Sequence, residues 1–240
     1  MCGRYTLHTE KEALAERFGF DPAALAPLPR RYNIAPTDSV LTVRAGGGEG
    51  AREPTFMRWG LVPWFAKEIG AQPLMINARI ETLATKPAFK DSLRAKRCLV
   101  PADAFYEWQA GSGSHKRRIP HLVARADGEP FAMAGLFAEW RRRGELLEET
   151  LLSCAIVTTA ANAAVEKLHD RMPVILPREA EARWLDPDLD GDTQALLALL
   201  QPIAAGELHT HPVSRRVNSV KNDDASLLAR DDSEPSLGFF

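Results

Sequence analysis

The 240-residue sequence predicts a single soluble α+β domain. Segments with strand-like alternation fill the middle of the chain, helical segments flank them, and neither an internal repeat nor a flexible interdomain linker separates them. Hydrophobic residues make up 45% and charged residues 26%, which is the balance of an ordinary globular protein. A chain of this length can bury one substantial core.

The predicted strands begin at the N-terminus, where MCGRYTL precedes a short amphipathic helix. Thr9 and Glu12 have the spacing of a helix capping box, and Gly19 supplies a stop signal. SVLTVRA then alternates apolar and polar residues, and the turn GGGEG predicts a hairpin with EPTFMRWGLVPWF. Further strands are expected in RCLVPADAFYEWQ, IPHLVARAD, PFAMAGLFAEW and LLSCAIVTTA.

Helices are expected in four further segments, and a loosely held tail is expected at the C-terminus. The helical segments are residues 86–94, residues 163–168 after an Asn162 cap, residues 178–185 after Pro177, and residues 193–204. The domain is expected to cover residues 2–223. Residues 224–240, which are charged and then apolar, form the expected tail.

Composition excludes several functional classes. The net charge of -2 means that any binding of nucleic acid must use a local basic surface. No apolar run is long enough to span a bilayer and no secretion signal is visible, so we expect no membrane partner and a cytoplasmic or nucleoid location. His209 and His211 lack accompanying ligands, so no metal site is expected.

Cys2 is the one cysteine that packing does not explain. The three cysteines form no CxxC pair, which argues against a disulfide framework or a zinc ribbon. Cys98 and Cys154 lie in apolar runs and are expected to be buried, inert thiols. If Met1 is removed, Cys2 carries a free α-amine and a thiol on adjacent carbons. No other position offers that pair.

Several polar residues interrupt apolar segments, and each has a simple structural explanation when it is taken alone. In FYEW, strand alternation favours a solvent-facing Glu107. Arg79 and Glu81 could form a surface ion pair, and a helix end could stabilise His169. The residues in question are Asn33, Asn77, Arg79, Glu107, His169 and Arg171.

Taken together, the motifs of the chain resemble those of the SOS response-associated peptidase (SRAP) family. The motifs are, in order, MCGRY, RYNIAPT, WGLVPW, NARIET, RCLVPADAFYEW, HDRMPVIL and VNSVKN, and they extend from residue 2 to about residue 223. The resemblance implies a mixed, barrel-like β-structure surrounded by helices. It also implies a monomer without a cofactor that crosslinks itself to abasic sites in single-stranded DNA during the DNA damage (SOS) response.

The resemblance also implies a set of site residues. Met1 would be removed, by the protein itself or by methionine aminopeptidase, and Cys2 would become the catalytic N-terminal residue, with Asn77, Glu107 and His169 as the other active-site residues. Phe65 stands where family members often have a second tryptophan. The implied contacts to DNA are Arg4, Asn33, Pro36, Trp64, Phe65, Arg79 and Arg171.

The chemistry of an abasic site explains why such residues are useful. Its ring-opened aldehyde can form a Schiff base with the α-amine of Cys2, and the neighbouring thiol can then close a thiazolidine ring. The ordinary pKa values, about 7.7 to 8.0 for the amine and about 8.5 for the thiol, suit neutral pH. Glu107 would act as acid and base, Asn77 would orient the amine or hold a sugar hydroxyl, and His169 would protonate the sugar oxygen and assist reversal.

Two other functions remain open from the sequence. Cys2 could be the nucleophile of a cysteine peptidase or N-terminal amidohydrolase. The simplest reaction of such an enzyme would be the removal of its own Met1. Alternatively, Trp64 and the arginines could bind single strands without catalysis. Whether the protein crosslinks to abasic sites or only binds single strands, its affinity for DNA should fall as the salt concentration rises and should depend little on the DNA sequence. A lyase activity would share the Schiff base of the crosslinking route.

Overall fold

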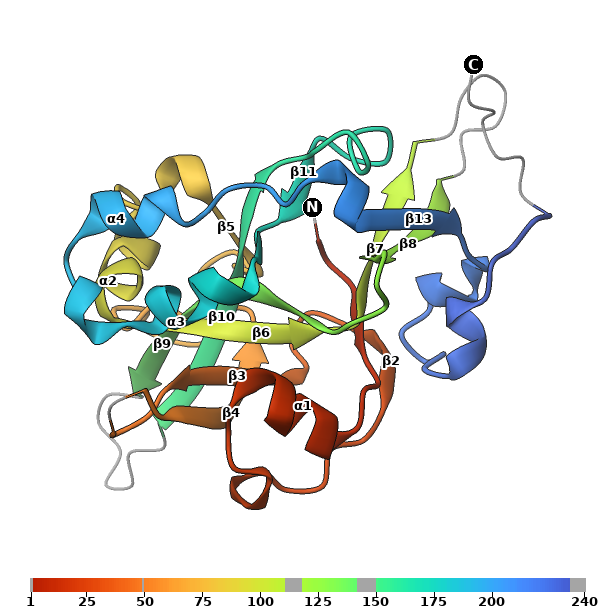
Figure 1. The fold of residues 1–240 in the computed structure, drawn as a ribbon. Helices are drawn as coiled ribbons and strands as arrows, with labels where there is room; N and C mark the ends of the chain where they lie inside the picture. The colour runs from red at the N-terminus through yellow and green to blue at the C-terminus, as the bar shows by residue number, and fades with distance from the viewer. Residues whose placement is uncertain (1, 49, 111–117, 142–149, 234–240) are drawn as a thin grey trace.

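A closed five-stranded mixed β-barrel forms the centre of the computed structural model, which describes residues 2–48, 50–110, 118–141 and 150–233 (Figure 1). The strands follow one another around the barrel in the order β10, β4, β3, β6, β9 and back to β10. The β10–β4 pair is parallel and the other neighbours are antiparallel. This arrangement confirms the expected α+β, barrel-like fold. The barrel strands are β3 (Ser39–Ala45), β4 (Arg52–Trp59), β6 (Arg97–Ala102), β9 (Phe131–Arg141) and β10 (Thr150–Ala160).

A smaller sheet stands beside the barrel. Its strand order is β13, β8, β7, β1 and β2, and the chain passes into it from the barrel at Asp103, between β6 and β7. Three short strands extend the barrel sheet: β5 and β11 pair with β10, and β12 pairs with β9. The bounds are β1 (Tyr5–Leu7), β2 (Arg31–Ile34), β5 (Asn77–Arg79), β7 (Ala104–Gln109), β8 (Ile119–Arg125), β11 (Arg171–Pro173), β12 (Ile175–Leu176) and β13 (Leu208–Pro212).

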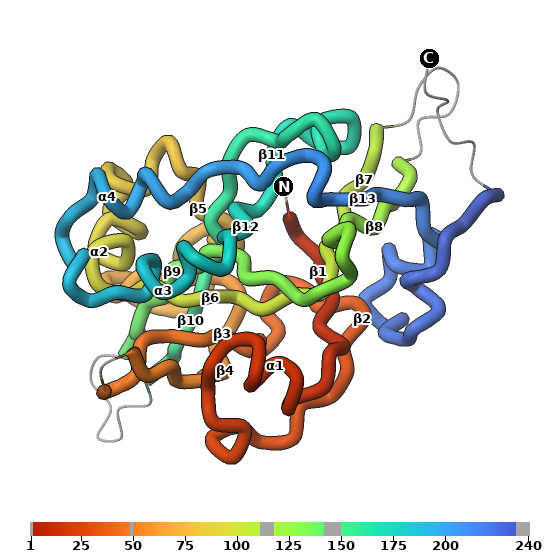
Figure 2. Tube along the Cα trace, viewed as in Figure 1, coloured from red at the N-terminus to blue at the C-terminus, as the bar shows by residue number. Residues whose placement is uncertain are grey.

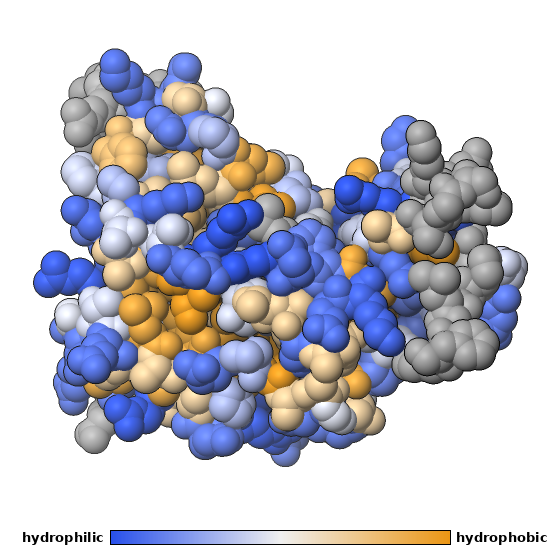
Figure 3. Space-filling view, turned by 90° about the horizontal axis from the view of Figure 1, so that it is seen from above, coloured by the Kyte–Doolittle hydropathy of each residue, from blue (hydrophilic) through white to orange (hydrophobic). Residues whose placement is uncertain are grey.

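Helices α2, α3 and α4 lie on the opposite side of the barrel from the smaller sheet, and α1 lies below β3 in the view of Figure 2. Figure 2 shows α2, α3 and α4 on the left of the barrel, with the smaller sheet and the C-terminal segment on the right. Seen from above, the outline of the molecule is notched at the top of the view, and hydrophilic residues cross the middle of this face (Figure 3). The α-helices are α1 (Lys11–Phe18), α2 (Pro87–Ala95), α3 (Arg178–Leu185) and α4 (Thr193–Ala198), and no helix in the described part of the chain is long and apolar enough to cross a membrane.

Both faces of β7, in the middle of the smaller sheet, are covered over residues 104–107. Along β7, Phe105 packs into the core shared with the barrel, whereas Ala104 and Tyr106 belong to a second apolar cluster. That cluster is completed by the chain that follows β13, through Val213, Val217 and Leu227. Residues 104–107 of β7 therefore point alternately into two different buried layers, whereas Trp108 and Gln109 at the end of the strand are partly exposed.

The second apolar cluster explains why the C-terminal segment differs from the loose tail expected for residues 224–240. Leu227 is fully buried within a 3₁₀ turn, Ala225–Leu228, and the backbone N–H of Asp231 donates to the carbonyl of Pro212 at 2.9 Å. Burial of a leucine stabilises a segment by about 1.5–3 kcal/mol. Residues 224–233 are thus part of the packed structure, and residues 234–240 lie outside the described residues.

Most predicted elements are confirmed, with two exceptions among the helices. The structure contains the N-terminal strand, the 39–59 hairpin, the helix at residues 178–185 and, displaced by one residue, the helix expected at 86–94. Residues 163–168 form turns instead of a helix, although Asn162 Oδ1 does accept from the N–H groups of residues 164 and 165. The last predicted helix ends at Ala198, because Pro202 has no N–H to offer its carbonyl.

The predicted capping box at Thr9 is wrong. The residue that precedes the first turn of α1 is Glu10, and no side chain caps the helix there. Thr9 instead donates its hydroxyl to Asp103 Oδ1 at 2.5 Å, and its backbone N–H donates to Asp103 Oδ2 at 2.9 Å. The predicted stop is confirmed, since Gly19 adopts the left-handed conformation with φ of 69°.

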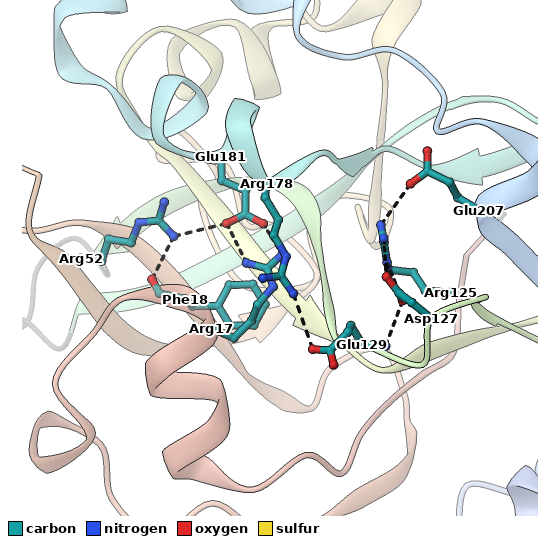
Figure 4. A network of polar contacts seen from close by, with 9 residues as sticks. All are labelled: Arg17, Phe18, Arg52, Arg125, Asp127, Glu129, Arg178, Glu181 and Glu207. Carbon is teal, nitrogen blue, oxygen red and sulfur yellow. Dashed lines mark hydrogen bonds and ion pairs between the residues drawn. The ribbon is translucent and has the colours of Figure 1, made fainter.

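A buried ion pair joins α1, β4 and α3 (Figure 4). Glu181 is 1% exposed and accepts from Arg17 at 2.6 and 3.1 Å and from Arg52 at 3.3 Å. Arg52 also donates to the carbonyl of Phe18 at 2.9 Å, which holds the end of α1 against the barrel. Loss of the carboxylate would leave the Arg17 guanidinium charged and buried without its counterion.

We expect Glu181→Ala to lower the free energy of unfolding by about 3–5 kcal/mol, the range for breaking one side of a buried pair. Chemical denaturation at neutral pH measures this change. Glu129→Ala is the matched control, because Glu129 forms a solvent-exposed pair with Arg178 at 3.5 Å and its loss should cost about 0–1 kcal/mol. Equal losses in the two variants would contradict the importance assigned to the buried pair.

Candidate functional site

Strand β10 brings together predicted site residues that are almost one hundred positions apart in the chain. Its C-terminal half pairs in parallel with β5, so that Ile156 lies opposite Asn77. On its other side it pairs with β11, where Ala160 lies opposite Arg171. Asn77, Arg79 and Arg171 are therefore grouped at one end of the barrel by strand pairing alone.

Cys2 reaches this end of the barrel from the smaller sheet. Tyr5 lies opposite Phe105, and the N–H of Tyr106 donates to the carbonyl of Arg4, so continuing this register places Gly3 opposite Glu107. Asn77 Nδ2 donates to the carbonyl oxygen of Cys2 at 2.9 Å. Cys2, Asn77 and Glu107 thus meet where the two sheets adjoin.

The Asn77 amide has unused hydrogen-bonding capacity. Its Oδ1 atom is buried and accepts no hydrogen bond from any described residue, while its Nδ2 holds the Cys2 carbonyl. A buried amide oxygen without a donor is uncommon in folded proteins. It is a ready acceptor for an amine or a hydroxyl group that enters the site.

Glu107 is buried, which overturns the solvent-facing position favoured by its strand pattern. It is 2% exposed because the face of β7 opposite Tyr106 and Trp108 is covered by the barrel. Burial raises the pKa of the Glu107 carboxyl, and His169, in its protonated form, acts in the opposite direction. Glu107 and His169 are therefore electrostatic neighbours, and a carboxyl that retains its proton to higher pH is suited to proton transfer.

The backbone fixes the orientation of the His169 ring. Its Nδ1 accepts the N–H of Arg171 at 3.0 Å, so the neutral ring carries its proton on Nε2. Asp170 also lies 2.6 Å from Nδ1, but its carboxylate is 84% exposed, and Nδ1 cannot donate to it while accepting from the backbone. We therefore assign the backbone bond to the neutral ring. Nε2 is then the atom that is free to give a proton to a bound group.

Arg171 is held at the site by two fixed partners. Its Nη2 donates to the carbonyl of Thr158 at 2.6 Å, and its Nη1 pairs with Glu81 at 2.6 Å. This hydrogen bond to Arg171 lowers the pKa of the Glu81 carboxyl. Glu81 thus pairs with Arg171, in place of the surface pair with Arg79 considered from the sequence, and the Arg79 side chain is exposed. The part played by Thr158 has no signal in the sequence.

All three thiols are buried in the chain that begins with Met1. Cys2 is 0% exposed, and burial, followed by the neighbouring Glu107, raises the pKa of its thiol. Burial also raises the pKa of Cys154 to about 12, as expected for an inert core thiol. Cys98 is equally buried. The unprocessed chain therefore holds its Cys2 thiol protonated and away from solvent.

Tyr5 is a neighbour of Cys2 that sequence reasoning missed. Its ring lies edge-on to Trp59, with the centroids 5.3 Å apart, and it is fully buried. Its hydroxyl accepts or donates no hydrogen bond among the described residues, and its pKa is raised by burial and then by Cys154 and Cys2. The only signal for Tyr5 in the sequence is its place within MCGRY.

Arg4 and Asn33 form a second group beside the first. Arg4 Nη1 donates to Asn33 Oδ1 at 2.7 Å and to the carbonyl of Val217 at 2.9 Å, and its guanidinium lies 5.9 Å from the centre of the Trp108 ring. Asn33 is 1% exposed, and its Nδ2 donates to the carbonyls of Val217, Ser219 and Asn222. Asn33 is thus placed to position Arg4 and the VNSVKN segment from within the protein.

Trp64 and Phe65 are exposed side chains outside these two groups. They are 57% and 40% exposed and contact each other edge-on, with ring centroids 5.6 Å apart. Trp64 Nε1 donates to Asp91 of α2 at 3.3 Å. In the described part of the chain, no hydrogen bond links the Trp64 side chain to Cys2 or Arg4. The two rings are positioned to meet a molecule that approaches the surface, and their role as DNA contacts stays a prediction.

The turn after Pro36 carries unusual backbone strain. Thr37 has a φ of 80°, and a β-branched residue rarely adopts this left-handed conformation. The strain is held in place because the Thr37 N–H donates to the carbonyl of Trp59 at 2.7 Å, and Asp38 Oδ2 accepts from the N–H of Ala35 at 3.1 Å. Strain of this kind is concentrated at functional sites. Sequence reasoning did not anticipate it.

No metal centre is indicated by the described residues, since none of their His, Cys, Asp and Glu side chains form a group of three or more that could hold an ion. His209 and His211 stack on one another with ring centroids 5.9 Å apart. His211 Nε2 lies 3.0 Å from the carbonyl of Leu228, so one of its ring nitrogens is already used within the protein.

We expect Glu107→Gln to be more stable than the parent protein at neutral pH. A carboxyl whose pKa is raised in the folded protein makes its full contribution to the free energy of unfolding below its unfolded pKa, near 4.5. That contribution is lost as the pH rises through the pKa of the folded protein. The advantage of the glutamine variant should therefore grow from pH 4 to pH 8. Thermal unfolding across this range, on two proteins with the same N-terminal residue, measures it. A parent protein that gains stability over the variant as the pH rises would contradict the raised pKa.

Comparison with known proteins extends over nearly the whole chain. Residues 1–220 match the family model described as SOS response associated peptidase (SRAP). The abasic site processing protein YoqW of Bacillus subtilis is 40% identical over 233 residues, covering 95% of this chain and 99% of that protein. The abasic site processing protein YedK of Escherichia coli is 34% identical, covering 95% and 99%.

More distant relatives and solved structures agree with this result. The abasic site processing protein HMCES of Mus musculus is 32% identical, covering 95% of this chain and 76% of that protein. A phage-related protein of known structure from Bordetella bronchiseptica is 32% identical, with a TM-score of 0.69 over 89% of this chain and 95% of that one. A structure from Bacteroides thetaiotaomicron, at 23% identity and a TM-score of 0.82, shares the fold over 96% of this chain and 100% of that one. The chain belongs to the SRAP family.

Proposed function

We propose that this protein processes abasic sites in single-stranded DNA by forming a covalent thiazolidine crosslink through Cys2, after Met1 has been removed. The observation that carries the proposal is the convergence of Cys2, Asn77, Glu107 and His169 at the junction of the two sheets. Relatives named as abasic site processing proteins, at 32–40% identity, support the same substrate.

Removal of Met1 is the first requirement. In the chain with Met1 the α-nitrogen of Cys2 is an amide, which is not a nucleophile, and its thiol is buried. After removal, the same nitrogen becomes an amine with an ordinary pKa of about 7.7 to 8.0. The Asn77–Cys2 carbonyl bond would fix the position of this residue, and the unused Oδ1 of Asn77 could accept from the new amine. Either the protein itself or an aminopeptidase could carry out the cleavage.

The crosslink would then form in two steps. The Cys2 amine adds to the aldehyde carbon of the ring-opened deoxyribose, and loss of one water molecule gives a C=N bond. The thiol adds across this bond, its sulfur joining the carbon and its proton going to the nitrogen, which closes the five-membered ring. Strand cleavage at the Schiff-base stage would give an associated lyase activity.

The proton transfers fall to two side chains. The Glu107 carboxyl, whose pKa burial has raised, can protonate the departing hydroxyl and accept a proton from the attacking amine. His169, with the proton on Nε2, can protonate the sugar oxygen as the ring opens. Asn77 has no proton to exchange at neutral pH and acts by position.

The arginines supply the local basic surface that a protein of net charge -2 needs. Arg79 is exposed beside Asn77, and Arg171 is anchored on Thr158 with its second nitrogen on the exposed Glu81. Arg4, held by Asn33, would contact the strand on the other side of Cys2. The exposed rings of Trp64 and Phe65 would stack on bases, which tolerates any sequence.

We expect the purified protein to form an adduct with abasic single-stranded DNA that survives a denaturing gel, and Cys2→Ala to abolish it. Cys98→Ala is the control, because that thiol lies in the barrel core and takes no part in the reaction. Intact-mass measurement of each protein establishes whether Met1 is absent. An adduct of undiminished yield from Cys2→Ala would overturn the thiazolidine route, and turnover of peptides without any DNA adduct would favour a peptidase.

We expect Glu107→Gln to slow adduct formation by about 10²-fold or more, the usual contribution of a general acid or base. Rapid-quench time courses with saturating abasic DNA measure the rate constant. The glutamine keeps the size of the side chain, so a loss of rate without a loss of binding identifies proton transfer as its cause. An unchanged rate constant would remove Glu107 from the reaction.

We expect Arg79→Gln to reduce the salt dependence of DNA binding. One phosphate contact on a single strand contributes a slope of about 0.7 in a plot of log affinity against log salt. Binding is measured by fluorescence anisotropy in the Cys2→Ala background, so that no covalent product forms. Arg44→Gln serves as the control, because Arg44 pairs with Glu53 on the β3–β4 hairpin. Equal slopes for Arg79→Gln and its parent would contradict the contact.

A further inference from the structure

We propose that the cavity between β13, β8 and the 163–168 turns binds the nucleotide that adjoins the abasic site, with its base at Gln109 and His121 and its phosphate at Lys167 and Arg230. The inference rests on the proposed function and names a binding site that this function does not include. The cavity has a volume of about 350 Å³, which is within the range of small-molecule sites.

The cavity is lined by residues that neighbour Glu107 and His169 in the sheet and along the chain. His121 lies opposite Glu107 across the β7–β8 pair, and Gln109 follows Glu107 by two residues, so all three side chains project from the same face of the sheet. Leu168, in the opposite wall, immediately precedes His169. A strand whose abasic sugar lies at Glu107 and His169 therefore has its next nucleotide beside this cavity.

The polar groups of the cavity suit a nucleobase. His121 Nδ1 lies 3.1 Å from the carbonyl of Ile119, and because a carbonyl can only accept, this nitrogen carries the ring proton. Burial lowers the pKa of the His121 ring, so that the neutral form, with Nε2 as an acceptor, prevails at neutral pH. Gln109 adds both a donor and an acceptor, and Thr210 adds a hydroxyl group.

The remaining lining suits the sugar and the phosphate. Apolar contacts come from Ala163, Ala164, Leu168, Leu208 and Pro212. Lys167 and Arg230 supply positive charge at the wall and the rim. Arg230 pairs with Asp232 at 2.6 Å, and both groups are more than half exposed, so this pair is weak and a phosphate can replace the carboxylate.

The test uses three abasic oligonucleotides, with the abasic residue internal, at the 5′ end or at the 3′ end. The concentration giving half-maximal crosslinking rate is measured for the parent protein and for His121→Ala. We expect the variant to raise this concentration about 5-fold on the internal site, the effect of losing one hydrogen bond to the base. With the two oligonucleotides whose abasic residue is terminal, the effect of His121→Ala should persist for one and vanish for the other. The one that shows no effect lacks the neighbouring nucleotide that would occupy the cavity.

A fourth oligonucleotide separates the base from the phosphate. It keeps the internal abasic site but replaces the occupying nucleotide with a tetrahydrofuran spacer, which retains the phosphate. His121→Ala should then have no effect, whereas Arg230→Gln should still raise the half-maximal concentration. His209→Ala is the control for both variants, because His209 is exposed on the face of β13 that points away from the cavity. Its neighbours Leu208 and Thr210 lie on the other face and line the cavity.

An effect of His121→Ala of equal size on every oligonucleotide, or no effect on any, would overturn the proposed site. Failure of the crosslinking chemistry itself is distinguishable, since no oligonucleotide would then give an adduct with the parent protein. In that case anisotropy with the abasic residue replaced by tetrahydrofuran supplies the same comparison of affinities. Thermal unfolding of both variants establishes that they are folded.

Discussion

The double covering of β7 is the constraint on which the site depends. One face of this strand packs against the barrel, and the other packs against the chain that follows β13, through Tyr106 and Leu227. A carboxylate on an ordinary half-exposed strand would keep its usual pKa. Because the barrel covers the face of β7 that carries Glu107, the carboxyl is removed from water beside Cys2, and its pKa is raised. The C-terminal segment packs on the opposite face, through Tyr106 and Leu227, and holds β7 against the barrel.

The surrounding hydrogen bonds show how the rest of the molecule maintains this arrangement. Asn33 uses its amide on three carbonyls of the 217–222 segment and on Arg4, which ties β2 to the cover of β7. Asp103 holds Thr9 at the point where the chain leaves the barrel for the smaller sheet. The junction of the two sheets is therefore fixed on both sides, which is what the proposed reaction between an N-terminal residue and a DNA aldehyde would require.

Much of the fold could be predicted from local sequence signals. The 39–59 hairpin, the strands of the chain centre and the helix at 178–185 follow from alternation, turn residues and Pro177. The errors came from tertiary contacts that local rules do not contain. Thr9 bonds to Asp103 in place of the helix, and Leu227 packs beneath the smaller sheet although the segment around it, NDDASLLARDD, is rich in charged residues. The alternation of side chains along β7 correctly placed Glu107 and Tyr106 on opposite faces of the strand. It could not show that the barrel covers the face that carries Glu107.

The candidate site was found through a family resemblance, and its geometry came only from the structure. No local signal places Asn77 beside the Cys2 carbonyl, since the parallel pairing of β5 with β10 that positions Asn77 joins segments about eighty residues apart. Tyr5, Thr37 and His121 were not singled out, because a buried hydroxyl, a strained φ and a cross-strand neighbour are properties of the folded chain.

The most direct measurement is mass spectrometry of the peptide that carries the DNA remnant after nuclease and protease digestion of the adduct. We expect a peptide that begins at Cys2, lacks Met1 and carries the deoxyribose remnant on its N-terminal residue with the thiol no longer free to alkylate. A remnant attached to a lysine side chain, or to a peptide that still begins with Met1, would contradict the assignment of Cys2 as the reacting residue.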